Sequence, residues 1–204
     1  MPLNRRHLLL TAPLALAGCG GILAKQPYTA RTDWPLAPRP DTAATGSGHG
    51  VVLGVVLVRG IQAGPALGDR GLITLLADGS IHRGYYNRWA VPPAQAVTAA
   101  LIAWLQDSGA FSAVVGEGSA LSPALIVEGT LDTLLADPTR RVARAALTLV
   151  VAKPVGIGER PLAQRRLTAT APLAGPTAPD LVAAQRAALA GVLRQAVAMV
   201  ESER

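Results

Sequence analysis

The chain has a single cysteine, Cys19, and this excludes an internal disulfide framework and any cysteine-rich zinc site. Aromatic residues are almost as scarce, with three Trp, three Tyr and one Phe among 204 residues. Charged side chains make up only 16% of the chain, whereas half of its residues are apolar. A composition this apolar and this weakly charged excludes a chain that is disordered throughout. The length corresponds to one ordinary domain or slightly more.

Lysine is also rare. Of the 19 basic residues only two, Lys25 and Lys153, are lysines, and the others are arginines. The formal net charge is +6, and removal of the N-terminal Arg5 and Arg6 would reduce it to +4. The basic residues form no dense run and are not interleaved with aromatic residues. These features argue against nucleic acid as a partner.

Residues 1–18 have the organisation of a secretory signal peptide, with a basic start, an apolar segment of about ten residues and small residues at the end. The apolar segment is too short to span a bilayer, which takes about 20 residues. Leu16-Ala17-Gly18-Cys19 resembles the bacterial lipobox, and this resemblance implies cleavage before Cys19 and its acylation, with palmitate among the acyl chains. Arg5-Arg6-His7-Leu8-Leu9 resembles a twin-arginine export motif, and a plain basic signal start fits these residues equally well.

Residues 19–49 are rich in Gly, Pro, Ala and Thr. This composition predicts a flexible, lipid-anchored tether, with a short strand around Tyr28, that reaches roughly 30 Å as a coil. We therefore divide the chain into a cleaved lipoprotein signal peptide (1–18), the acylated Cys19 with its tether (19–49) and one folded domain (50–204).

The domain has the pattern of an α+β fold. Residues 51–58 are almost continuously apolar and predict a central strand that is buried on both faces. Asp78-Gly79 predicts a hairpin between strands at 72–76 and 81–86. Further strands are expected at 111–115, 125–135, 142–151 and 165–171, with turns at 137–139 and 153–158.

In the strand at 125–135, alternation places five residues on the inner face (Leu125, Val127, Gly129, Leu131, Leu135) and Glu128, Thr130 and Asp132 on the outer face. The strand at 142–151 should turn Ala145, Leu147, Leu149 and Val151 inward.

Two helices complete the pattern. The first is expected at about 94–107, with Gly109 as its C-terminal stop, and Trp89 and Trp104 should be buried in or beside it. The second should begin after Thr177, which has the character of an N-cap residue. The expected fold is a largely antiparallel sheet with two helices packed on it.

The residues that carry chemistry are few, and we expect no catalytic, cofactor-binding or metal site. Three histidines occur, of which His7 is lost with the signal peptide, His49 lies in the tether and His82 lies in a hairpin strand. Glu128 and Asp132 share a strand face, but four residues of strand separate their Cα atoms by roughly 13 Å. The carboxylates of glycosidases lie about 5–9.5 Å apart. The simplest interpretation is two acids on a solvent-facing strand.

Arg140-Arg141 and Arg165-Arg166 most simply place charge at strand ends and on strand faces, and a basic patch for anionic headgroups is the alternative. No nucleophile elbow of the Gly-x-Ser-x-Gly kind is present.

The order of these features resembles the ABC-type transport auxiliary lipoproteins, the family of PqiC. The resemblance rests on the lipobox, a tether with an early Gln26-Pro27-Tyr28-Thr29 segment, an apolar strand, a hairpin and the step Arg88-Trp89-Ala90-Val91-Pro92 into a helix. It continues through the strand that begins Leu125-Ile126-Val127-Glu128-Gly129 to the C-terminal helix and so covers nearly the whole chain.

This resemblance implies an outer-membrane lipoprotein that faces the periplasm in a Gram-negative envelope and maintains envelope integrity. Its partners would be an MCE-domain protein that carries lipids between the membranes, and an ABC permease and ATPase. Gly20, directly after Cys19, resembles the outer-membrane sorting pattern. The family assembles into rings, so the resemblance also implies a homo-oligomeric ring with a docking role and no enzymatic activity. The alternatives are another envelope-assembly lipoprotein, serving lipopolysaccharide or outer-membrane proteins, and a lipid-anchored hydrolase.

Overall fold

The computed structural model describes residues 28–38 and 53–203. The chain divides into two compact units, Met1–Ala30 and Arg31–Arg204. The predicted signal peptide, Cys19 and most of the predicted tether lie outside the described residues. The described helices and strands belong to the second unit.

Among the described residues, nine strands and two helices follow one another along the chain: β1 (Thr32–Trp34), β2 (Leu53–Val58), β3 (Gln62–Ala63), β4 (Gly71–Leu75), β5 (Ile81–Trp89), α1 (Pro93–Asp107), β6 (Phe111–Gly116), β7 (Leu125–Asp137), β8 (Val142–Val155), β9 (Gly158–Pro172) and α2 (Ala178–Ser202). The long strands β7, β8 and β9 form two consecutive antiparallel hairpins, which contain most of the paired residues of the sheet. The predicted α+β class with a largely antiparallel sheet is confirmed.

Strand β7 organises the sheet, because both of its edges are paired. Strand β8 runs antiparallel to one edge. The other edge is shared by three shorter strands in succession, all parallel to β7: β2 beside Leu125–Val127, β3 beside Thr130–Leu131 and β4 beside Ala136. Beyond these, β6 pairs with β2, β5 pairs with β4, and β1 pairs with β5. The sequence pattern did not predict this parallel part of the sheet.

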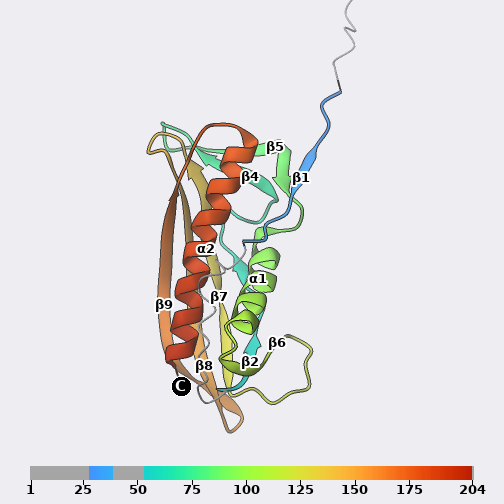
Figure 1. Ribbon diagram of the computed structural model, residues 1–204, viewed down its shortest axis with the longest axis vertical. Helices are drawn as coiled ribbons and strands as arrows, with labels where there is room; N and C mark the ends of the chain where they lie inside the picture. The colour runs from blue at the N-terminus through green and yellow to red at the C-terminus, as the bar shows by residue number, and fades with distance from the viewer. Residues whose placement is uncertain (1–27, 39–52, 204) are drawn as a thin grey trace, which may run out of the picture. The chain divides into compact units, whose positions relative to one another are not determined.

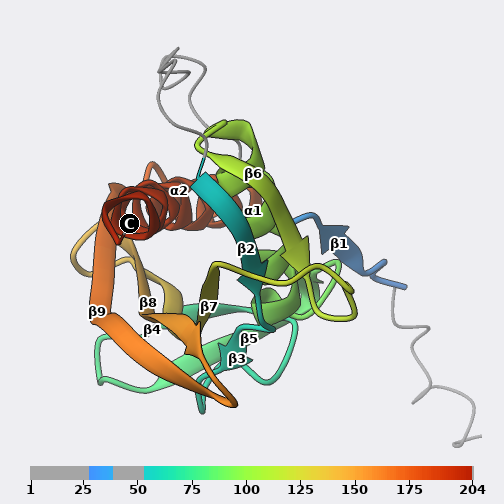
Figure 2. The same ribbon diagram turned by 90° about the horizontal axis from the view of Figure 1, so that it is seen from below.

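Both helices pack on one face of the curved sheet, as Figure 1 and Figure 2 show. Helix α2 lies along the long strands, whereas α1 lies beside α2 and over β2 and β6. The core between helices and sheet is apolar, and its largest fully buried side chains include Trp89, Leu101, Leu147 and Leu193. The helices thus cover one sheet face and leave the polar face of β7–β9 outside.

The helix boundaries agree with the sequence pattern. Helix α1 begins at Pro93, and Gly109 follows its end with a φ of +67°. This left-handed conformation is one that glycine adopts without a steric penalty. Helix α2 begins after Thr177, whose hydroxyl accepts a hydrogen bond from the backbone N–H of Asp180 at 3.4 Å. Trp89 and Trp104 are buried, as expected.

Two of the long strands, β9 and β7, differ from the sequence prediction. Strand β9 begins seven residues before the predicted 165, because Lys153–Val155 pair with Gly158–Arg160 and reduce the predicted turn at 153–158 to two residues. Strand β7 carries a register shift between Leu131 and Thr133. As a result Leu134 and Ala136 are buried in the core, whereas Leu135, predicted to face inward, is only partly buried.

In β2, described from Leu53, Val56 and Val58 are buried, and Val55 and Leu57 are half-buried. The strand is central, but only one of its faces is fully buried, so the prediction of two buried faces is wrong.

The division of the chain into 1–18, 19–49 and 50–204 stays a prediction, but part of the predicted tether belongs to the folded unit. The expected short strand forms at Thr32–Trp34 and not around Tyr28. Leu36 is buried in the core, and the carbonyl of Pro38 accepts a hydrogen bond from Trp104 Nε1 at 2.9 Å. The partners that bury Leu36 and bind the Pro38 carbonyl lie far along the chain. Local composition therefore cannot show that these residues are part of the folded unit.

Candidate functional site

The predicted lipidation site, Cys19, lies outside the described residues, and its acylation stays a prediction. His49 also lies outside them. His82 lies on β5 beside Thr74 of β4, and its side chain is exposed. This matches its interpretation as a surface residue of the hairpin.

The two acids of the outer strand face are each engaged by an arginine. Glu128 Oε2 accepts a hydrogen bond from Arg59 Nη1 at 2.9 Å. Asp132 Oδ2 accepts one from the Thr148 hydroxyl at 2.7 Å and lies 3.4 Å from Arg166 Nε. The two carboxylates therefore belong to separate ion pairs, and the interpretation as two solvent-face acids holds.

Around Glu128 the outer face of the sheet forms an open groove of about 400 Å³. The polar side chains that line it are those of Arg59, Gln62, Glu117, Glu128, Thr130, Thr148 and Gln164. Arg59 reaches a second carboxylate as well, that of Glu159, at 3.0 Å from Nη1 and 2.5 Å from Nη2. One guanidinium therefore connects the end of β2 with β7 and the start of β9.

The hydrogen bonds to Glu159 and then to Glu128 raise the pKa of Arg59 well above its ordinary value. Because Arg59 donates hydrogen bonds to two carboxylates, its N–H groups point at other protein groups. Each of the two carboxylates in turn accepts at least one of these hydrogen bonds. The arrangement joins the end of β2, β7 and the start of β9. Its geometry is typical of a structural cross-link and not of a catalytic acid–base pair.

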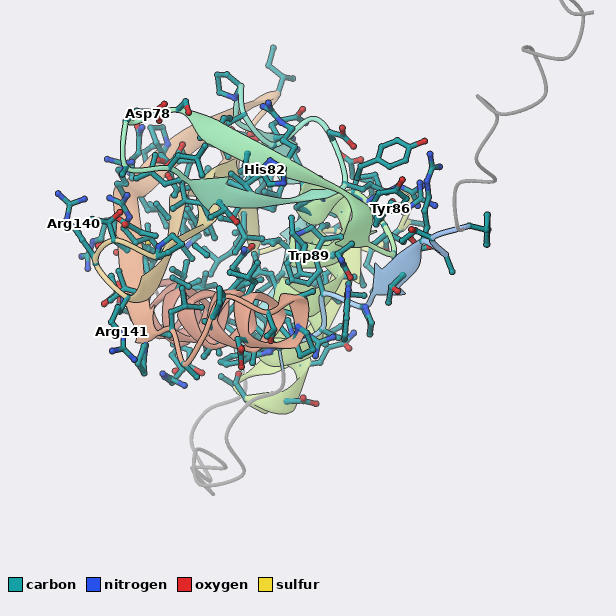
Figure 3. The ribbon with its side chains drawn as sticks, turned by 90° about the horizontal axis from the view of Figure 1, so that it is seen from above. Asp78, His82, Tyr86, Trp89, Arg140 and Arg141 are labelled. Atoms are coloured by element: carbon teal, nitrogen blue, oxygen red, sulfur yellow. The ribbon has the colours of Figure 1, made fainter. Side chains whose placement is uncertain are left out.

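The two arginine pairs found in the sequence lie apart in the sheet. Arg165 and Arg166 lie on β9, opposite Leu149 and Thr148 of β8. Arg140 and Arg141 lie in the turn between β7 and β8, at the end of the sheet seen in Figure 3. Their placement at a strand end and on a strand face agrees with the simpler interpretation of these pairs.

The turn between β7 and β8 holds a buried carboxylate. The side chain of Asp137 is 2% exposed, and its Oδ2 lies 3.1 Å from both Arg140 Nη1 and Arg144 Nη2. Burial raises the pKa of Asp137, but the backbone and side-chain hydrogen bonds from Arg140 and the charges of both arginines outweigh it, so the net pKa is lowered. Asp137 fixes the turn that displays Arg140 and Arg141.

The step Arg88-Trp89-Ala90 is a junction between β1, β5 and α1. Trp89 is buried, and the N–H of Ala90 donates to the carbonyl of Trp34 at 2.7 Å. Arg88 Nε donates to Asp33 Oδ1 at 2.6 Å, and this hydrogen bond lowers the pKa of Asp33. The residues that carried the family resemblance thus hold β1, which is part of the predicted tether, against the sheet.

Sequence reasoning missed one surface feature. Tyr85 and Tyr86 belong to the predicted hairpin strand, but their side chains are 62% and 46% exposed. The available signal was Gly84 followed by two aromatics in a chain that has only seven. Alternation alone would have turned one of the two rings inward.

Within residues 28–38 and 53–203, no group of three or more His, Cys, Asp or Glu side chains is placed to hold a metal ion. In the same described part of the chain, neither helix has the length and apolar character needed to cross a bilayer.

Comparison with known families identifies the chain. The family of ABC-type transport auxiliary lipoprotein components matches residues 35–197. The chain belongs to this family. The match begins directly after β1 and ends inside α2, so the described strands β2 to β9 all fall within it. Among the curated proteins, no sequence matches the chain significantly.

Solved structures support the fold of the auxiliary lipoprotein domain. Protein XCC0632 from Xanthomonas campestris, of family DUF330, superposes with a TM-score of 0.67 at 17% identity, covering 84% of this chain and 96% of that one. An uncharacterised protein gives a TM-score of 0.57 at 14% identity and covers 85% and 99%. The hypothetical protein CT253 from Chlamydia trachomatis gives 0.50 at 13% identity and covers 74% and 98%. At these identities the likeness shows the fold.

Proposed function

We propose that this auxiliary lipoprotein is a non-catalytic docking subunit of an envelope lipid-transport system. Its partners are an MCE-domain protein together with an ABC permease and ATPase. The single observation that carries the proposal is the family match over residues 35–197, because the family is an auxiliary component of ABC-type transport. The more specific lipid-transport role rests in addition on the resemblance of the sequence to PqiC.

The proposal places the protein on the periplasmic side of the outer membrane, held by acyl chains on Cys19. Leu16-Ala17-Gly18-Cys19 provides the lipobox and Gly20 the sorting residue. Two or three acyl chains hold a protein on a bilayer where one chain binds only reversibly. A tethered domain has a raised local concentration for a partner that ends near the same membrane, and this strengthens weak contacts.

The geometry of the polar groups supports docking over covalent chemistry. Arg59, Glu128 and Glu159 bind one another, and Asp132 pairs with Thr148 and Arg166. A general base or nucleophile must instead direct a group at a substrate within hydrogen-bond distance. The proposal also includes a homo-oligomeric ring, since several copies of a small domain can surround the end of a partner.

The experiment is genetic and biochemical. We expect the affinity-tagged lipoprotein, solubilised from membranes, to co-purify with an MCE-domain protein and an ABC permease, and cross-linking before lysis to trap an oligomer. Deleting the gene should sensitise cells to membrane stress as much as deleting the MCE gene, and the double deletion should be no worse.

Two results would contradict the proposal. An additive double-deletion phenotype would indicate an independent envelope role. Co-purification with lipopolysaccharide or outer-membrane-protein assembly factors, in place of an MCE protein, would favour the other class of envelope lipoprotein. A matched strain with the Gly68→Ala variant, at an exposed position where a Cβ meets nothing within 4 Å, serves as the control for expression and handling.

A further inference from the structure

Two exposed tyrosines of β5 and an arginine just before β1 form a compact cluster, here called the β5 aromatic patch (Arg31, Tyr85, Tyr86). The two rings meet edge to face with centroids 5.1 Å apart. The guanidinium carbon of Arg31 lies 4.1 Å from the centre of the Tyr85 ring. The patch is therefore an ordered aromatic and cationic surface.

The backbone of β5 is built to display these rings. The register between β4 and β5 passes from Gly71 opposite Arg88 to Ile73 opposite Arg83, so residues 84–87 bulge out against one residue of β4. A Cβ on Gly84 would lie 2.6 Å from the carbonyl oxygen of Asn87, so the bulge requires glycine there. Bulges re-aim side chains, and this one directs two large aromatics outward where a regular strand would turn one inward.

The same end of the sheet carries exposed positive charge. Thr74 of β4 pairs with His82 of β5 and also with Ala136, next to the turn that holds Arg140 and Arg141. Figure 3 shows Tyr86 on one side of this end and the two arginines on the other, with His82 between them. The side chain of Arg140 is 70% exposed, and Asp137 supplies one negative charge against three arginines.

Arg141 has a φ of +53°, a conformation that is uncommon for residues other than glycine. Its carbonyl accepts a hydrogen bond from the N–H of Leu173 at 2.9 Å, which fixes the turn. The cationic turn is thus held in one conformation by its own backbone and by Asp137.

Through Arg31, the patch lies close in sequence to the predicted anchor. Arg31 is the first residue of the folded unit and follows Cys19 by only about a dozen residues. A coil of that length spans roughly 20 Å. Tyrosine rings sit well at the headgroup level of a bilayer, and arginines near the surface are attracted by anionic lipids.

We propose that this end of the folded unit docks on an anionic phospholipid surface. The β5 aromatic patch lies at the headgroup level, and Arg140 and Arg141 lie over lipid phosphates. This inference rests on the proposed acyl anchor at Cys19. It deepens the proposed function, because docking would give the anchored domain a fixed orientation. The β8–β9 hairpin, at the far end of the 14-residue β8, then points away from the membrane.

That hairpin is the competing membrane contact, since Val155 and Ile157 at its tip are fully or largely exposed. It lies about 45 Å along β8 from the Arg140–Arg141 turn, at about 3.3 Å per residue. An experiment that reports on both ends of β8 therefore decides between them.

The test uses the acylated full chain in vesicles of phosphatidylethanolamine and phosphatidylglycerol. His82→Cys or Gly158→Cys supplies one free thiol for an environment-sensitive NBD label, because acylation occupies Cys19, the only native cysteine. His82 is exposed, and a Cβ on Gly158 meets only the Val155 oxygen at 4.0 Å, so both sites accept a label. We expect a several-fold emission gain, a blue shift and quenching by nitroxide-labelled lipids at residue 82, and none of these at residue 158.

Further variants assign the effect to the patch. In the His82→Cys background, Tyr85→Ser with Tyr86→Ser should abolish most of the emission gain, and Arg140→Gln with Arg141→Gln should weaken it. Phosphatidylcholine vesicles should weaken it as well. Ile157→Ser is the matched control and should leave it unchanged. Circular dichroism and the melting temperature show whether each variant remains folded.

The outcomes separate this inference from the proposed function. Protein that does not float with the vesicles has no acyl anchor, and both proposals then fail. Protein that floats while residue 82 stays in water overturns the orientation alone and leaves the anchor intact. Insertion of residue 158 in place of residue 82 assigns the membrane contact to the hairpin, and protection of residue 82 only after a protein partner is added assigns the patch to that partner.

Discussion

Single side chains connect part of the predicted tether to the core of this auxiliary lipoprotein. Trp104 on α1 is 5% exposed, and its indole N–H donates to the carbonyl of Pro38, 66 residues earlier. A buried indole combines a large apolar surface with one polar group that needs a partner. Trp104 therefore contributes both packing and a fixed position for residues 35–38.

We predict that Trp104→Ala lowers the free energy of unfolding by about 3–5 kcal/mol, a large share of the ~5–15 kcal/mol typical of a domain. The reason is the cavity left by the indole and the loss of its hydrogen bond. Chemical denaturation followed by circular dichroism measures the change. Trp104→Phe keeps most of the packing and should cost less, with about 1 kcal/mol coming from the lost hydrogen bond. Equal stability of Trp104→Ala and wild type would show that the α1 face is misassigned.

Asp137 makes stability depend on pH in a defined direction. Its pKa in the folded protein is lowered below the ordinary value of 3.8. A lowered folded-state pKa means that the carboxylate stabilises the fold above the unfolded pKa, and this contribution is lost as the pH falls through the folded pKa.

We therefore expect Asp137→Asn to be less stable than wild type at pH 7, with the difference disappearing as the pH falls below about 3.8. Urea denaturation curves at a series of pH values measure it. Asp78→Asn is a useful comparison, because Asp78 has a lowered pKa from its hydrogen bonds with Ser80 but lies in an exposed turn. A stability difference for Asp137→Asn that persists unchanged at low pH would exclude the proposed role of its charge.

At the scale of elements, the regular period of a strand explains most of β7 and β8 but not the bulge. Ala145, Leu147, Leu149 and Val151 are buried as alternation requires. In β7 the same alternation holds only as far as Leu131, because one additional residue at the register shift moves every later side chain to the other face. The paired partner strand decides where such a bulge forms, so the β7 sequence alone could not indicate it.

Gly129 lies where the backbones of β7 and β8 approach each other closely. A Cβ built there would lie 2.2 Å from the carbonyl oxygen of Thr148 on β8. We predict that Gly129→Ala destabilises the domain by about 1–3 kcal/mol, because the β7–β8 backbones must separate to accommodate a methyl group. Thermal unfolding measures the effect. Gly68→Ala is the matched control, since a Cβ there meets nothing within 4 Å, and it should change stability by less than about 0.5 kcal/mol. Similar melting temperatures for the two variants would contradict the close approach.

At the scale of the whole molecule, the chain combines a folded unit with a predicted lipid anchor. The family match over residues 35–197 assigns the folded unit to the auxiliary lipoprotein components. The anchor itself is a short linear motif that ends at Cys19. Its acylation is therefore testable separately from the stability of the domain.

We predict that Cys19→Ser releases the protein from the membrane pellet into the soluble periplasmic fraction, because the serine hydroxyl cannot form the thioether to the lipid. Cell fractionation and immunoblotting measure the distribution. Ser47→Ala, in the predicted tether and away from the lipobox, is the control and should stay in the membrane fraction. If Cys19→Ser pellets as tightly as wild type, another part of the chain holds it on the membrane.

The sequence by itself determined the features that depend on local pattern. The two helices, the Asp78-Gly79 hairpin, the α+β class and the family follow from periodicity, turn chemistry and the order of short motifs around Arg88-Trp89. The tertiary structure alone decided the pairing of β7 with three parallel strands. It also decided that residues 32–38 are part of the folded unit and that Tyr85 and Tyr86 both point outward. Each of these depends on contacts between residues far apart in the chain. Backbone hydrogen bonds and close approaches of that kind leave no periodic trace in the residues that make them.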